Sequence, residues 1–189
     1  NTTAPSASIS ATATTLTCTT TSSTLTASGG GTYLWSTGAK TADISVSSKG
    51  TYTVTVTNST NGCTNTASQA IGSNTTAPTA GITNNTGTTT LTCTTTSISV
   101  TATGGSSYAW SGGSSKTTAA NTLSSQGDYT VTVTSSNGCT GTKSITIGTN
   151  TTAPSASISA TATTLTCSTT SSTLTAKGGG TYLWSTGAK

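Results

Sequence analysis

The 189-residue sequence predicts an all-β fold made of tandem antiparallel β-sandwich domains. One observation is that apolar residues alternate with Thr or Ser over short segments, which is the period of a half-buried strand. Another is that the whole pattern returns after about 75 residues, with Gly-rich turns between the segments and no helical period anywhere. A repeat of this length holds enough strands to form its own domain.

The repeat is read from four short motifs. Asn-Thr-Thr-Ala-Pro begins at residues 1, 74 and 150, Leu-Thr-Cys at 16, 91 and 165, Tyr-x-Trp at 33, 108 and 182, and Asn-Gly-Cys at 61 and 137. The expected domains are therefore 1–73, 74–149 and a truncated third copy at 150–189. Each boundary is short and contains Pro, which stiffens the junction by restricting φ. We expect the domains to stack into a rod.

Six strands are expected in the first repeat. They cover residues 6–17, 23–28, 32–36, 43–48, 51–58 and 64–71, each separated from the next by a turn. The clearest is 51–58, where Tyr52, Val54 and Val56 fall on one face and Thr on the other, because strand side chains alternate. Thr is β-branched and favours the strand backbone, so it can cover the wet face without charge.

Short strands at regular spacing, with a Trp in the third, are typical of an Ig-like sandwich. The expected cores contain Leu16, Leu25, Trp35, Ile44, Tyr52, Val54 and Val56 in the first repeat, and Leu91, Val100, Trp110, Leu123, Tyr129, Val131 and Val133 in the second. Trp184 is the equivalent core residue of the third. Domains of this size bury little apolar surface and often need a covalent cross-link.

The five cysteines are expected to supply that cross-link, as one disulfide per domain. Cys18 and Cys63 are separated by 45 positions, and Cys93 and Cys139 by 46, so we predict the bonds Cys18–Cys63 and Cys93–Cys139. The partner of Cys167 would lie beyond Lys189. A metal site is disfavoured because the chain has no His and no Cys-x-x-Cys pair. Disulfides place the protein outside the cytoplasm.

The composition disfavours catalysis. The chain has 57 Thr and 32 Ser but no His, Met, Phe, Arg or Glu, so few groups titrate near neutral pH. Asp43 and Asp128 occupy non-equivalent positions and lack a second carboxylate, which disfavours calcium binding and glycoside hydrolysis. We expect no enzyme activity, no cofactor and no metal. The net charge of +4 is scattered and no long apolar run exists, so neither nucleic acid nor membrane insertion is expected for this segment.

The residues also resemble a known family. Tyr33-Leu34-Trp35-Ser36-Thr37-Gly38-Ala39, the string from Gly50 to Thr57, and Asn61-Gly62-Cys63 are similar to the Ig-like tandem repeats of giant Bacteroidota cell-surface adhesins, of the SprB type that serves gliding motility. The second repeat departs at Ser111-Gly112-Gly113 and Gly127-Asp128-Tyr129. The resemblance implies export by the type IX route and attachment to the outer surface.

Three functions follow as hypotheses. The leading one is a stalk or filament segment of a giant extracellular adhesin, attached to the outer membrane or secreted, whose stacked domains act mechanically. The alternatives are a carbohydrate-binding module that uses exposed Tyr and Trp rings, and a passive spacer of a secreted multidomain enzyme. Expected partners are the neighbouring repeats, with lateral self-association into filaments and a surface polysaccharide as open alternatives.

Overall fold

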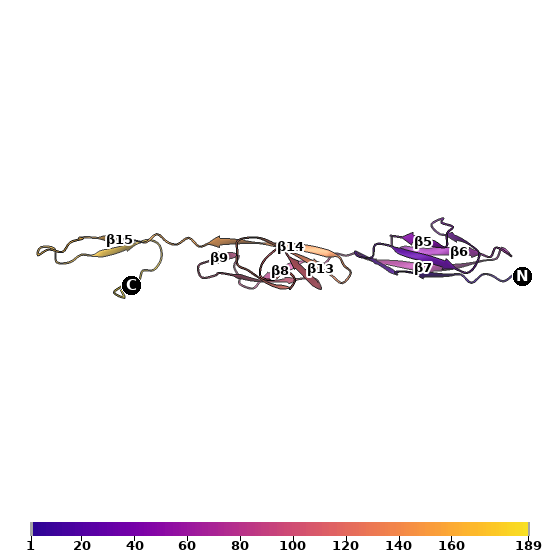
Figure 1. Cartoon of the computed structure of the whole chain (residues 1–189), viewed down its shortest axis with the longest axis horizontal. Helices are drawn as coiled ribbons and strands as arrows, with labels where there is room; N and C mark the ends of the chain where they lie inside the picture. Colours follow the sequence, from indigo (N-terminus) through magenta and orange to yellow (C-terminus); the bar gives the residue numbers. More distant parts are fainter. Residues whose placement is uncertain (1, 189) are drawn as a thin grey trace.

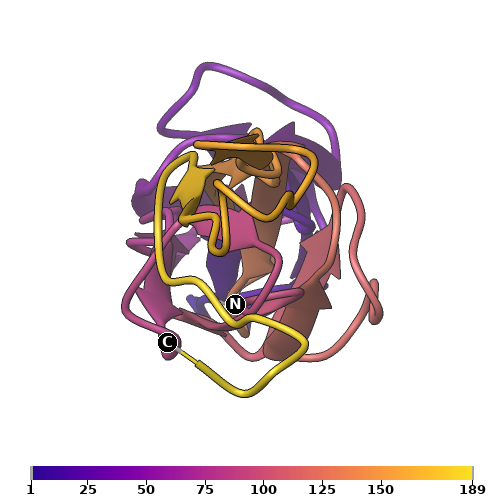
Figure 2. The same cartoon turned by 90° about the vertical axis from the view of Figure 1, so that its left-hand side faces the viewer.

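The computed structural model describes residues 2–188, which form strands, turns and extended segments and contain no helix. The three repeats lie end to end along one long axis (Figure 1). A view along that axis shows the repeats one behind another (Figure 2). The predicted rod is therefore confirmed.

Each of the first two repeats is a sandwich of two sheets. In repeat 1 one sheet has the order β1-β3-β5 and the other β2-β7-β6-β4. The strands are β1 (Ser8–Ala11), β2 (Thr15–Thr17), β3 (Ser23–Ser28), β4 (Thr32–Trp35), β5 (Asp43–Val46), β6 (Gly50–Thr57) and β7 (Thr64–Asn74).

Repeat 2 has the same two sheets, in the orders β12-β10-β8 and β11-β13-β14-β9. Its strands are β8 (Gly81–Asn84), β9 (Thr90–Thr92), β10 (Ile98–Thr103), β11 (Ser107–Trp110), β12 (Ala120–Leu123), β13 (Gly127–Thr134) and β14 (Thr140–Asn150).

The topology is that of an Ig-like domain. The strand carrying the buried Trp, β4, pairs with β6, and β6 pairs with β7, as the C, F and G strands of an Ig sandwich do. The phenol of Tyr52, near the start of β6, donates a hydrogen bond of 2.8 Å to the carbonyl of Ser48, and Tyr129 does the same to Ser125 at 3.0 Å. This is the tyrosine corner that Ig-like sandwiches share.

The expected first strand, residues 6–17, is wrong in one respect. It breaks into β1, which pairs with β3 in one sheet, and β2, which pairs with β7 in the other. The reason is that the chain crosses between sheets around residues 12–14, where Thr12 and Ala13 are tied to β3 by hydrogen bonds to Thr24 and Ser23. As a result β2 runs parallel to β7, with Leu16 opposite Ser73.

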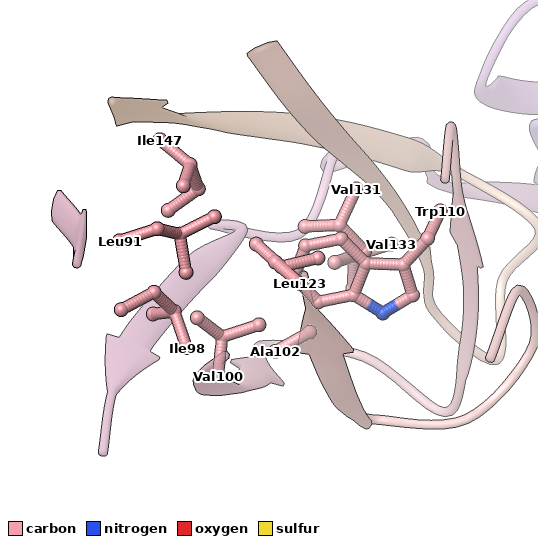
Figure 3. Close-up of a cluster of buried hydrophobic side chains, with 9 residues drawn as sticks. All are labelled: Leu91, Ile98, Val100, Ala102, Trp110, Leu123, Val131, Val133 and Ile147. Atoms are coloured by element: carbon pink, nitrogen blue, oxygen red, sulfur yellow. The ribbon is translucent and has the colours of Figure 1, made fainter. Parts of the chain in front are cut away.

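The cores are small and follow the alternation of the sequence. Repeat 2 buries Trp110 beside Val131, Val133 and Leu123, and Leu91, Ile98 and Ile147 fill the other end of the core (Figure 3). Repeat 1 does the same around Trp35, which is 2% exposed. Each indole N–H donates to a backbone carbonyl, Trp35 to Thr41 at 2.9 Å and Trp110 to Thr118 at 3.0 Å. The predicted core residues are thus confirmed for both repeats, with Ile44, Tyr52 and Tyr129 packed at the margins.

Trp184 does not occupy a core, and the prediction for it is wrong. In repeat 3 only β15 (Ser157–Ala160) and β16 (Leu174–Lys177) pair, and Trp184 remains half-buried. Residues 150–188 supply no counterpart of β5, β6 and β7, which form most of the wall around Trp35. Leu165 and Leu174, the equivalents of the buried Leu16 and Leu25, consequently stay open to water, 60% and 52% exposed.

The core can be tested with two leucines of repeat 1. Leu25 is fully buried, whereas Leu34 is 50% exposed on the next strand. We expect Leu25→Ala to destabilise repeat 1 by about 2–5 kcal/mol, because it leaves a cavity beside Trp35. Leu34→Ala should cost less than about 1 kcal/mol. Hydrogen exchange followed by mass spectrometry on peptides of β3 and β6 measures both, and equal effects would contradict this core.

Candidate functional site

The most distinctive site lies between repeats 1 and 2. Cys18 of repeat 1 is bonded to Cys139 of repeat 2, with the Cα atoms 5.0 Å apart and a sequence separation of 121. The bond is therefore a cross-link between two domains and leaves both hydrophobic cores free of cysteine. Within the described residues, Cys63, Cys93 and Cys167 are free thiols.

The predicted bonds Cys18–Cys63 and Cys93–Cys139 are wrong. Cys18 directly follows β2, which is in register with the last residues of β7, whereas Cys63 directly precedes the first residue of β7. The two cysteines lie at opposite ends of an 11-residue strand, which spans about 33 Å at the usual rise. A disulfide requires Cα atoms within about 7 Å. The same 11-residue separation by β14 keeps Cys93 away from Cys139.

The loop that holds Cys18 is a tight turn after β2. The amide of Thr17 donates to the carbonyl of Thr20 at 2.9 Å, and the amide of Thr20 donates to the hydroxyl of Thr17 at 3.0 Å. Hydroxyl-to-backbone bonds of this kind stabilise turns locally. The turn places Cys18 at the pole of repeat 1 that faces repeat 2.

The loop that holds Cys139 connects β13 to β14. The amide of Cys139 donates to the side-chain oxygen of Asn137 at 3.0 Å, and its carbonyl accepts from the amide of Ser135 at 3.0 Å. Gly138 has φ +77°, which glycine adopts without the steric cost that Cβ imposes. A Cβ at Gly138 would also lie 2.4 Å from Cγ2 of Thr19, so the two loops need glycine in order to approach each other.

Asn137 joins the two repeats by hydrogen bonds. Its amide nitrogen donates to the carbonyl and side-chain oxygens of Asn74, at 3.2 and 3.1 Å, and to the carbonyl of Thr76 at 3.0 Å. Its own carbonyl accepts from the amide of Cys18 at 3.2 Å. Asn137 thus binds the linker through its side chain and the Cys18 loop through its backbone carbonyl. The disulfide and these bonds form a compact junction.

Repeat 1 covers the bonded cysteine of repeat 2. Cys139 is 2% exposed, whereas Cys63, its equivalent in repeat 1, is only half-buried. The difference arises because Cys139 has the pole of the preceding repeat packed over it, and Cys63 does not. The pole of repeat 1 also bears an open groove lined by Leu16, Thr21, Ser48, Lys49 and Thr76. Its only ionisable side chain is Lys49.

The other candidate residues do not form a chemical site. Asp43 and Asp128 lie on the exposed faces of different repeats, and Asp128 accepts a hydrogen bond of 2.6 Å from Thr146. Among residues 2–188, no group of three or more His, Cys, Asp or Glu side chains gathers as a metal would require. Trp35 and Trp110 are buried, so they offer no face on which a sugar could stack.

Comparison with known proteins adds little to this geometry. No protein-family model and no curated protein matches the chain. Among solved structures the chain is similar to the crystal structure of the four N-terminal Ig domains of Dscam1 isoform 6.44, at 12% identity and a TM-score of 0.27. The match covers 93% of this chain and 59% of that chain. The sheet order and the tyrosine corner are the features that make the first two repeats Ig-like.

The disulfide identifies the kind of compartment. Structural disulfides persist in oxidising surroundings and are rare in the reducing cytoplasm, so the chain matures as an extracellular-type domain. In the part of the chain that the structure describes, no helix is long and apolar enough to cross a membrane.

Two glycines test whether the junction guides the formation of the bond. Gly138 and Gly62 have similar φ values, +77° and +71°, but only at Gly138 would a Cβ meet the other repeat. We expect Gly138→Ala to lower the equilibrium constant for the Cys18–Cys139 bond in a glutathione buffer about tenfold, as a strain of about 1.4 kcal/mol would. Gly62→Ala should leave it unchanged. Thiol counting after denaturation distinguishes three free thiols from five, and similar losses in both variants would refute a role for the contact.

Proposed function

We propose that this chain is a stalk or filament segment of a giant extracellular cell-surface adhesin, and that it acts mechanically and not as an enzyme. The observation that carries the proposal is the Cys18–Cys139 bond, because it joins two domains at the point where a pulled rod would otherwise depend on a short linker. The end-to-end arrangement of the repeats gives the segment reach (Figure 1).

The bond changes how tension travels. A force applied to the two ends reaches Cys18 and crosses directly to Cys139, so residues 19–138 are removed from the load path. Even if both sandwiches opened, those residues would not add to the length of the chain. The cross-link therefore limits extension as well as resisting separation of the domains.

The strand order favours resistance to force within a domain. The chain enters repeat 1 through β1 and β2 and leaves it through the end of β7, and β2 is parallel to β7 over Thr15–Thr17 and Gly72–Asn74. In the reduced chain, where the Cys18–Cys139 bond no longer bypasses β7, pulling the ends apart loads these backbone hydrogen bonds in shear, so they must break together. Repeat 2 has the same parallel pair in β9 and β14.

The surface suits a segment that works outside the cell. Thr side chains cover the outer faces of the strands and only eight residues are charged, so the rod is polar with little charge of its own. Such a surface permits lateral packing of filaments and contact with a surface polysaccharide, which we include as proposed partners beside the neighbouring repeats. The resemblance to gliding adhesin repeats of Bacteroidota supports attachment to the outer surface and a role in adhesion or gliding.

The burial of the Trp rings weighs against the carbohydrate-binding alternative, since a stacking site needs an exposed aromatic face. A passive spacer would share the fold but would have no requirement for a covalent junction between its domains. The stalk function therefore explains more of the structure.

Single-molecule force spectroscopy tests the load path. Pulled from its ends, the oxidised chain should reach a final contour length about 400 Å shorter than the reduced chain, because 121 positions at about 3.3–3.6 Å each stay behind the bond. Cys18→Ser should extend fully without reductant. Cys93→Ser changes the equivalent loop of repeat 2 but removes a free thiol, so it should behave like the parent. Equal lengths with and without reductant would refute the mechanical function.

A further inference from the structure

Cys63 and Cys93 occupy loops that match the two halves of the observed disulfide. Cys93 follows Leu91 and Thr92 as Cys18 follows Leu16 and Thr17, and Cys63 ends the same Asn-Gly-Cys motif as Cys139. Cys18 and Cys139 are bonded to each other, whereas Cys63 and Cys93 are free.

The free Leu-Thr-Cys loop has the bonded conformation. The amide of Thr92 donates to the carbonyl of Thr95 at 2.9 Å and the amide of Thr95 to the hydroxyl of Thr92 at 2.9 Å, against 2.9 and 3.0 Å in the Cys18 loop. The loop of Cys167 repeats both bonds, at 2.9 and 3.0 Å, although its repeat has no packed core. The conformation is thus encoded locally and exists before any bond forms.

The free Asn-Gly-Cys loop also has the bonded conformation. The amide of Cys63 donates to the side chain of Asn61 at 3.0 Å, as that of Cys139 does to Asn137, and Gly62 has φ +71° beside +77° for Gly138. Asn61 donates to the carbonyl of Thr3 as Asn137 does to that of Thr76, in the same linker motif. The linker is therefore held in the same way at the entry to both repeats.

The two free thiols lie at opposite poles of the pair of repeats. Cys63 precedes β7 at the pole where repeat 1 begins, and Cys93 follows β9 at the pole where repeat 2 ends. Cys93 is exposed, and its sulfur approaches the carbonyl of Thr151 at 3.8 Å, in the linker Asn150–Pro154 that repeats Asn74–Pro78. Each thiol thus lies where a further repeat, joined through the same linker, would present the complementary loop.

We propose that Cys63 and Cys93 are sites of further inter-repeat disulfides. Cys63 bonds the Leu-Thr-Cys thiol of a repeat placed before it, and Cys93 bonds the Asn-Gly-Cys thiol of a repeat placed after it. Each bond forms by exchange with a disulfide oxidant such as oxidised glutathione. One protein thiolate attacks the oxidant and releases one thiol. The second protein thiolate attacks the mixed disulfide and releases the other, so two protein thiols lose two protons and two electrons and the oxidant becomes two thiols.

The consequence is a set of overlapping covalent loops. The bond from Cys18 to Cys139 already encloses Cys93, so a bond from Cys93 to the next repeat would start inside the first loop and end outside it. Two covalent paths would then run along the rod side by side, one through residues 64–92 and the other through residues 140–166. No repeat in the interior of such a rod could separate from either neighbour. The pairing of these cysteines is independent of the proposed stalk function. Only the effect of the added bonds on how the rod carries tension rests on that function.

The experiment completes the third repeat and reads the pairing without any force. A second copy of residues 41–73 is joined after Lys189, and the chain is refolded in a glutathione redox buffer, alkylated and digested without reduction. Because the first and third repeats are nearly identical, this segment supplies the missing strands and one Asn-Gly-Cys thiol. Mass spectrometry is expected to find that thiol bonded to Cys93, beside the Cys18–Cys139 bond.

Several results would overturn the proposal. They are a bond from the added thiol to Cys167 within the third repeat, a bond to Cys63, or an added thiol that remains alkylated while the repeat is folded. Cys93→Ser in the extended chain serves as the control and should leave the added thiol reduced. For Cys63, a copy of residues 74–149 joined ahead of Asn1 should supply a Leu-Thr-Cys thiol that bonds it, and a Cys63 that stays free would refute that half. If the thiols pair as proposed but the bonds leave the contour length unchanged, the stalk function is refuted and the pairing stands.

Discussion

The parallel pairing of β2 with β7 is the constraint on which the rest of this structure depends. Because the two strands run in the same direction, the residues after β2 and the residues after β7 emerge at the same pole of the sandwich. The first set contains Cys18 and the second is the linker to the next repeat. A cysteine in that place can reach only forwards along the rod. An antiparallel arrangement would have directed it back toward the start of its own domain, where Cys63 lies.

The location of the disulfide also explains how so small a core is sufficient. In many Ig domains a disulfide between the sheets packs against the Trp, whereas here Leu25 and Val54 fill the space around Trp35. The core therefore does not need the cysteines, which lie at the poles of the sandwich instead. There they link neighbouring domains, and the bond closes a loop of 121 positions, which stabilises the folded repeats by restricting the unfolded chain. The core keeps the sandwich folded, and the junction makes an array out of sandwiches.

The junction combines local and long-range order in a way that suits repetition. The Thr17–Thr20 turn and the Asn137–Cys139 turn form from hydrogen bonds within a few residues, so every copy carries both halves ready-made. What differs between copies is only whether the complementary half is present. Asn137 and Gly138 then allow the Cys139 loop to approach the Cys18 loop. Asn137 binds the linker, and Gly138 leaves room for Thr19. A single motif, duplicated, is enough to extend the rod.

The sequence by itself determined the repeat, the positions of most strands and the composition of the cores, because these follow from local periodicity. Residues such as Tyr52, Val54 and Val56 alternate with Thr, and that alternation states which face is buried. It also indicated that Cys18 and Cys139 each form a disulfide, but it did not identify the partner of either. Only the tertiary structure decided which cysteines meet, because spacings of 45 and 46 residues are compatible with bonds within a repeat until the length and direction of β7 and β14 are known. The break between β1 and β2 and the exposure around Trp184 were decided in the same way, since both depend on strands distant in the chain that pair or are absent.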